Sequence, residues 1–198
     1  FYAIRKDQES LRNKKMNLGG DIQSASQIFC RDIDIALPII GGAMYPCSNP
    51  ELVAAVSEAG GLGVVQPLSL TYVHGYEFRA GLRYIRSLTS KPIWVNLLIE
   101  SSSSRYLDRI KTWLDISLEE GVTFFVPALG NPRFVAEKVH ANAGQVYHNA
   151  TNRKWAAKAL DGGVDGLICV NDRAGGHAGT ESADQLFKNL IDYGKPLI

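Results

Sequence analysis

The sequence has few cysteines, no long apolar segment and no excess of one charge. Its three cysteines, Cys30, Cys47 and Cys169, lie far apart and form neither a CxxC pair nor a metal-ligand cluster, which favours a reducing compartment. No apolar run approaches the roughly 20 residues of a membrane-spanning helix, and the first residues lack the apolar core of a signal peptide. The formal charge of +1 provides no overall field for nucleic acid or an anionic membrane. We therefore expect a cytoplasmic protein without a bound metal, whose partners are small or locally recognised.

From Leu37 onward, short apolar runs alternate with longer segments of helical periodicity. The apolar runs predict strands at 38–43, 62–65, 92–97, 122–126, 145–148 and 164–170, and the start of another at 195–198. The periodic segments predict helices at 50–59, 76–88, 103–120, 132–143, 153–161 and 181–192. Residues 1–36 are polar and weakly periodic. They predict a partly loose N-terminal extension in front of one domain at 37–198.

Six strand–helix units without a long linker predict a parallel sheet, because parallel neighbours are joined by crossover helices. A (β/α)8 barrel and an open doubly wound sheet both fit this pattern. The doubly wound sheet is less favoured, because no GxGxxG follows the first strand, where Gly41-Gly42-Ala43-Met44-Tyr45-Pro46 stands. A complete barrel typically needs about 250 residues. We therefore predict an α/β fold, an incomplete TIM barrel of six units plus the start of strand seven, as a fragment of a longer protein.

Barrel enzymes place their sites at the carboxyl ends of the strands. At those ends this sequence has glycines, amides and histidines but almost no carboxylates, a set that suits a flat hydrogen-bonding ring better than a hard metal ion. His177 lies in the segment Ala174-Gly175-Gly176-His177-Ala178-Gly179, where no apolar periodicity accounts for it. We expect a flavin and a proton-transfer base to meet at this segment.

Several of these residues also have a purely structural interpretation. Gly41-Gly42 fits a tight turn, Met44 fits ordinary packing, and Asn96 fits a helix cap. His148 fits a buried histidine that bonds a backbone carbonyl. The sequence leaves both interpretations open.

The order of the segments resembles the nitronate monooxygenase family, formerly called 2-nitropropane dioxygenases, which are FMN-dependent barrel enzymes. The resemblance runs from about Leu37 to Ile198. It rests on Pro38-Ile39-Ile40-Gly41-Gly42-Ala43-Met44, on residues 50–63, on Lys91-Pro92-Ile93-Trp94-Val95-Asn96-Leu97, on Gly163-Val164-Asp165-Gly166 and on residues 174–179. Each piece alone is a weak signal, and their combination in this order is specific.

The resemblance implies a role for each matching residue. His177 would be the catalytic base. The cofactor contacts would fall on residues at strand ends: Gly42, Ala43, Met44, Asn96, Ala174, Gly175 and Gly176. Two further cofactor positions are less direct, since Asn149 stands where some members have lysine and Gln66 is assigned by location only. The family's phosphate-binding glycines would follow Ile198.

The implied activity is FMN-dependent oxidation of alkyl nitronates by O2 to a carbonyl compound and nitrite, and of nitroalkanes once a base removes the α-proton. Two alternatives remain. One is a flavin-dependent enoyl-thioester (enoyl-ACP) reductase that uses NAD(P)H and shares the Ala-Gly-Gly-His segment. The other is a non-catalytic flavin-binding barrel. We expect no nucleic-acid or membrane partner, and the oligomeric state, including a homo-oligomer, stays open.

Overall fold

The computed structural model describes residues 25–100 and 103–198. The strands are β1 (Ile40–Gly41), β2 (Leu62–Val65), β3 (Ile93–Ile99), β4 (Phe124–Leu129), β5 (Gln145–Ala150) and β6 (Gly166–Cys169). The α-helices are α2 (Ala25–Ile33), α3 (Pro50–Glu58), α4 (Phe78–Leu88), α5 (Ser104–Glu119), α6 (Arg133–His140), α7 (Arg153–Asp161) and α8 (Ala183–Leu190). A π-helix, η1 (Ser69–Val73), follows β2, and a 3-10 turn, η2 (Ile191–Tyr193), follows α8.

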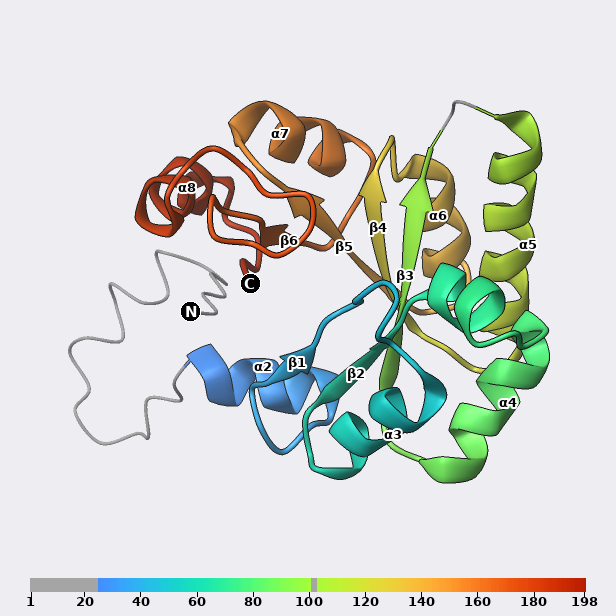
Figure 1. Ribbon diagram of the computed structural model, residues 1–198. Helices are drawn as coiled ribbons and strands as arrows, with labels where there is room; N and C mark the ends of the chain where they lie inside the picture. The colour runs from blue at the N-terminus through green and yellow to red at the C-terminus, as the bar shows by residue number, and fades with distance from the viewer. Residues whose placement is uncertain (1–24, 101–102) are drawn as a thin grey trace.

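The strands form one parallel sheet in which each strand pairs with the next one along the chain, in the order β1 to β6. A doubly wound sheet reverses its strand order at a switch point, so this sequential order excludes it. Figure 1 shows the sheet curling, with helices along its outer side. Leu197 forms a parallel bridge to Leu167, so the expected seventh strand begins beside β6. The fold is the predicted incomplete TIM barrel.

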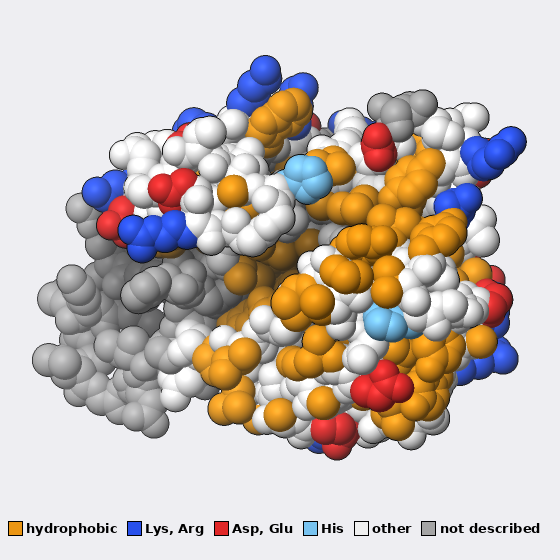
Figure 2. Space-filling model, viewed as in Figure 1, with side chains coloured by type: hydrophobic (Ala, Val, Ile, Leu, Met, Phe, Trp, Pro, Cys, Tyr) orange, Lys and Arg blue, Asp and Glu red, His pale blue; other side chains and the backbone are white. Residues whose placement is uncertain are grey.

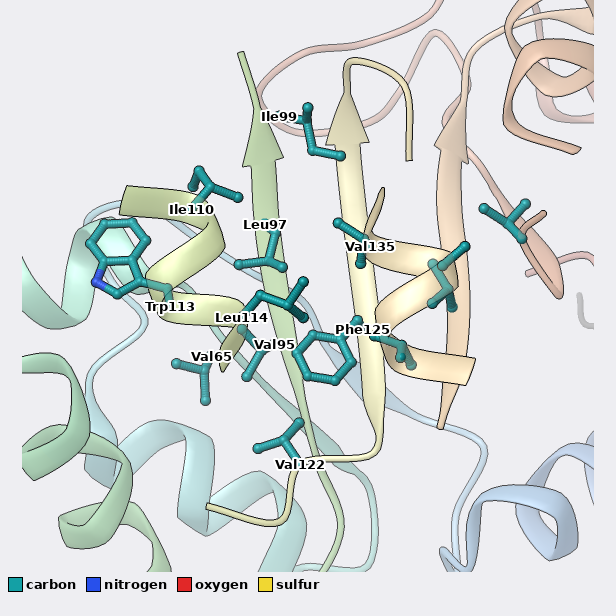
Figure 3. Close-up of a cluster of buried hydrophobic side chains, with 14 of the residues drawn as sticks. Val65, Val95, Leu97, Ile99, Ile110, Trp113, Leu114, Val122, Phe125 and Val135 are labelled. Atoms are coloured by element: carbon teal, nitrogen blue, oxygen red, sulfur yellow. The ribbon is translucent and has the colours of Figure 1, made fainter. Parts of the chain in front are cut away.

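The two faces of the sheet carry separate hydrophobic clusters, because successive residues of a strand point to opposite faces. On the outer face, Leu97 and Phe125 pack against Leu114 of α5 and Val135 of α6 (Figure 3). The inner face carries a second cluster, which we call the inner cluster: Phe29, Ile33, Leu62, Val64, Trp94, Val126 and Tyr147. The sheet is therefore buried on both sides, as a barrel wall is.

Helix α2 was not predicted by the sequence, which places it in the loose extension. Phe29 and Ile33 are both 2% exposed and belong to the inner cluster. The N–H groups of Ala36 and Leu37 donate to the carbonyl of Gly60 in the turn before β2, so α2 lies at the amino ends of the strands. Two buried apolar positions are too few to produce a visible period. Residues 1–24 of the predicted extension lie outside the described residues.

Local signals place most elements correctly and misplace some ends. Asn49 caps α3 as its sequence indicates, because its Oδ1 accepts the N–H of Leu52 at 2.7 Å. The first strand is shorter than the predicted 38–43, since Pro38 has no N–H and the chain turns away after Gly41. Strand β4 runs past the predicted Val126, because its pairing with β3 continues to Leu129. The π-helix η1 was not predicted.

Candidate active site

The inner face of the sheet presents a layer of small and amide residues near its carboxyl edge. A residue two positions after a member of an inward-facing set faces inward too, because side chains alternate along a strand. By this rule Asn96, two positions after Trp94, and Asn149, two positions after Tyr147, face inward. Gly42 and Gln66 directly follow the last residues of β1 and β2, so all four predicted cofactor residues lie at the carboxyl edge of the sheet.

The amides of this layer keep hydrogen-bonding groups available. Asn96 is 6% exposed, and its Nδ2 donates to the carbonyl of Val126 at 2.9 Å, which leaves Oδ1 without a partner among the described residues. Gln66 is 4% exposed, and its Oε1 accepts the N–H of Ser69 at 2.6 Å, which leaves Nε2 without a described partner. Asn96 and Gln66 thus offer an acceptor and a donor, which a ring carrying both N–H and C=O groups can use. Asn96 caps no helix.

Two glycines in the described part of the chain have no internal reason to be glycine. At Gly42 and Gly175, an added Cβ would meet no atom within 4 Å, and neither residue has the positive φ that favours glycine. Each of the other described glycines has either a positive φ or a close neighbour, as at Gly41, where a Cβ would lie 2.9 Å from Val56. A tight turn therefore does not require glycine at position 42. A bare backbone with open space in front suits close approach by another molecule.

The loop after β1 carries Ala43 and Met44 at the surface. Met44 is 45% exposed and so fills no gap in the core. Its N–H donates to Ser48 Oγ at 2.9 Å, and the carbonyl of Pro46 lies 3.1 Å from His74 Nε2, which joins this loop to the segment after η1. Figure 2 shows a hollow with an apolar floor between these loops and the segment that follows β6.

His177 lies at the exposed tip of the loop of residues 171–181, which we call the His177 loop. The tip, residues 175–178, makes no backbone hydrogen bond to the described part of the chain, and Gly176 has a φ of +75°. The His177 ring likewise has no hydrogen-bond partner among the described residues. Its two nitrogens are therefore available to a substrate. Ala174 and Gly175 precede it in the same loop.

His148 faces away from this surface, toward the helices. Its Nδ1 lies 2.9 Å from the carbonyl oxygen of Asn149 and its Nε2 3.0 Å from that of Gly130. Burial lowers the pKa of His148 to about 4. The two carbonyls would favour the charged ring, but desolvation outweighs them because the residue is only 4% exposed. The structural interpretation of His148 is confirmed.

A pocket of about 480 Å³ lies at the opposite end of the barrel. It is lined by the end of α2 and by the turns before β3 and β4, including Arg86, Lys91, Asp34 and Glu120. Barrel enzymes act at the carboxyl ends of their strands, so this pocket is not the candidate active site. In the described ranges, no group of three or more His, Cys, Asp or Glu residues is arranged to hold a metal, and no helix is long and apolar enough to cross a membrane.

Comparison with known proteins places the chain in a family. The model of the nitronate monooxygenase family matches residues 28–193. The chain belongs to this family. The nitronate monooxygenases are flavin-dependent oxidoreductases, which is the enzyme class that the sequence predicts.

The relatives include proteins of more than one named activity. The nitronate monooxygenase of Pseudomonas aeruginosa is 30% identical, and the match covers 76% of this chain and 52% of that protein. The (3aS,4S,5R,7aS)-5-hydroxy-7a-methyl-1-oxo-octahydro-1H-indene-4-carboxyl-CoA dehydrogenase of Rhodococcus jostii is 26% identical over 160 residues, covering 81% of this chain and 43% of that protein. The structure of FabK from Thermotoga maritima has a TM-score of 0.68 at 26% identity, covering 83% and 50%. The chain spans about half the length of these relatives.

Sequence reasoning missed the contacts that shape the site loops. The bond between Gln66 and Ser69 begins the π-helix, and the contact between His74 and Pro46 joins two loops. The contact between His74 and Pro46 has no signal in the sequence, because it depends on where two loops meet in space, whereas the bond between Gln66 and Ser69 is local and was not recognised as a cap.

Proposed function

We propose that the protein binds FMN on the inner layer at the carboxyl edge of the sheet and oxidises alkyl nitronates with O2 to a carbonyl compound and nitrite. The observation that carries the proposal is the pair Gly42 and Gly175. Both lack an internal reason to be glycine, and both lie where the family resemblance expects the flavin ring. Family membership supports the flavin and the class of reaction.

The residues present fit the ring of a flavin. The free Oδ1 of Asn96 would accept a hydrogen bond from a ring N–H, and the free Nε2 of Gln66 would donate to a ring carbonyl or nitrogen. Gly42 and Gly175 would allow the ring to approach the backbone, with Ala43, Met44, Ala174 and Gly176 beside them. Asn149 would replace the lysine of some members with a neutral donor. When bound, FMN supplies the electron acceptor for the nitronate, and O2 completes the oxidation.

His177 would act on the substrate rather than on the cofactor. The α-proton of a nitroalkane is acidic because the nitro group delocalises the resulting anion, so a neutral imidazole within hydrogen-bond reach would remove it. The His177 ring is exposed and has no hydrogen-bond partner among the described residues, so no bond to that part of the chain competes with the substrate. A substrate offered as a nitronate has already lost this proton and needs no base.

This difference provides the test. The flavin-loaded protein is assayed for nitrite release with propionate 3-nitronate and with a neutral nitroalkane. His177→Asn should lower turnover of the nitroalkane by about 100-fold or more, the usual range for a general base, and change turnover of the nitronate by much less. Equal losses on both substrates would remove the base assignment. If the unmodified protein releases nitrite from neither substrate, the proposed activity is wrong.

A second candidate is a flavin-dependent reductase or dehydrogenase of acyl thioesters that uses a nicotinamide cofactor. It is favoured by the similarity to a carboxyl-CoA dehydrogenase at 26% identity. Anaerobic mixing with NADH or NADPH separates the two. Rapid bleaching of the flavin absorbance supports the thioester enzyme, and persistence supports the monooxygenase. A non-catalytic flavin-binding barrel would instead be yellow and inert with both sets of reagents.

A further inference from the structure

The His177 loop is closed at its base by backbone hydrogen bonds. The carbonyl oxygen of Asn171 accepts the N–H groups of Ala174 and Gly179, at 3.3 and 3.0 Å. The N–H of Asp172 donates to the carbonyl oxygen of Glu181 at 2.9 Å. Residues 175–178 make no backbone hydrogen bond to the described part of the chain, so among the described backbone hydrogen bonds only those of the two ends of the loop, residues 171–174 and 179–181, hold the tip. We call these two ends the legs of the loop.

Each leg is also held by a side chain. The Oδ1 of Asn171 accepts the N–H of Arg173 at 2.8 Å, which makes an Asx turn and shapes the first leg. The Oε2 of Glu181 accepts Nδ2 of Asn189 at 2.7 Å, which ties the second leg to α8. The carbonyl of Asn189 in turn accepts the side chain of Arg153, so the second leg is connected to α7 as well. One leg is stabilised within the loop and the other by the barrel wall.

We propose that Asn171 and Glu181 are positioning residues for His177. They touch neither substrate nor cofactor in this role, and they act by fixing the two legs that carry the histidine toward its substrate. The inference rests on the proposed function, because it needs His177 to act as the base. A misplacement of about 1 Å in a reacting group commonly costs about 100-fold in rate, so two hydrogen bonds at the base of the loop are sufficient to matter.

The experiment compares four variants of the flavin-loaded protein with two substrates. Asn171→Ala and Glu181→Ala remove the side-chain acceptors Oδ1 and Oε2 and leave the backbone carbonyls in place. Asn171→Asp and Glu181→Gln retain a side-chain oxygen in the same place. The alanine variants should lower kcat on a neutral nitroalkane by about 10- to 100-fold with little change in KM, and keep nitronate turnover within about twofold. The conservative variants should recover most of the loss. The matched control is Asn142→Ala, in the turn after α6 at the other end of the barrel. This variant should leave the turnover of both substrates unchanged.

Two readouts do not depend on activity. Amide hydrogen exchange at Asp172 and Gly179, two of the donors that close the loop, should be faster in the alanine variants. In the conservative variants the exchange rate should be close to that of the unmodified protein. Because Gly175 lies on the same loop, every assay is run at an FMN concentration that saturates each variant, and bound flavin per chain should then stay constant.

The outcomes separate this inference from the proposed function. If His177→Asn is selective for the nitroalkane but the alanine variants are not, the positioning role is wrong and the base assignment stands. If the alanine variants lose both activities equally together with flavin, the residues have only a general structural role and the inference is overturned. If His177→Asn is not selective either, the base assignment and the inference both fail.

Discussion

Adding one methyl group at Gly42 or Gly175 should weaken flavin binding without weakening the fold. In the chain itself the new Cβ would meet no atom within 4 Å, and the backbone at both positions is one that alanine adopts. Such a change usually leaves the free energy of unfolding unchanged or raises it by about 0.4–1 kcal/mol, because alanine reduces the entropy of the unfolded chain. If the flavin ring occupies the space in front of these glycines, the methyl group overpacks the complex and weakens the free energy of flavin binding by about 1–3 kcal/mol. That range corresponds to a Kd for flavin about 5- to 150-fold higher.

The control is Gly63→Ala in β2. There the added Cβ would lie 2.1 Å from the carbonyl oxygen of Val53, so the backbone of α3 or β2 would have to move. We expect the free energy of unfolding to fall by about 3 kcal/mol, the upper part of the usual range for overpacking. Denaturant unfolding of the flavin-free protein measures the stabilities, and quenching of flavin fluorescence on titration measures Kd. The reasoning is refuted if Gly42→Ala and Gly175→Ala both bind flavin within twofold of the unmodified protein.

Two further predictions concern groups outside the cofactor surface. Burial lowers the pKa of His148 from 6.5 to about 4 in the fold, so the unfolded chain binds more protons than the folded chain between these two pH values. The free energy of unfolding should therefore fall by up to about 3 kcal/mol as the pH drops from 6.5 to 4. His148→Gln should remove this part of the pH dependence, and identical unfolding curves for both proteins across that range would contradict it. Phe125→Ala should lower the free energy of unfolding by about 3–5 kcal/mol, because the ring is 1% exposed between the sheet and its helices; a loss below 1 kcal/mol would show a looser core.

The strand and helix pattern of the barrel was predictable because each element carries its own signal. Apolar runs such as 93–97 are buried on both faces of the sheet and read as strands, and a cap such as Asn49 acts on its immediate neighbours. The sequential strand order has no local signal; it was predicted indirectly, by choosing the barrel over the doubly wound sheet, and the pairing of β1 through β6 confirms it.

The candidate site was predictable in its residue types more than in its arrangement. Strand ends bring Gly42 and Asn96 to the same edge of the sheet, and this follows from the sequence once the strand positions are known. Side-chain alternation along the strand separates His148 from Asn149, which the sequence alone treats as one strand end. Helix α2 could not be anticipated because it packs against partners distant in the chain, and the base of the His177 loop could not be anticipated because its hydrogen bonds, within the loop and to α8, depend on the path of the loop.

The sequential strand order has a consequence for how the chain folds during synthesis. Paired residues such as Ile40 with Leu62 and Trp94 with Phe124 are about 20 to 30 residues apart, so each new strand finds its partner in the unit made just before it. The sheet can therefore grow one unit at a time as the chain leaves the ribosome. Helix α2 is the exception, since its cluster includes Tyr147 of β5, more than 100 positions later. Helix α2 precedes every described strand in the chain, yet it should be among the last of the described elements to reach its final packing.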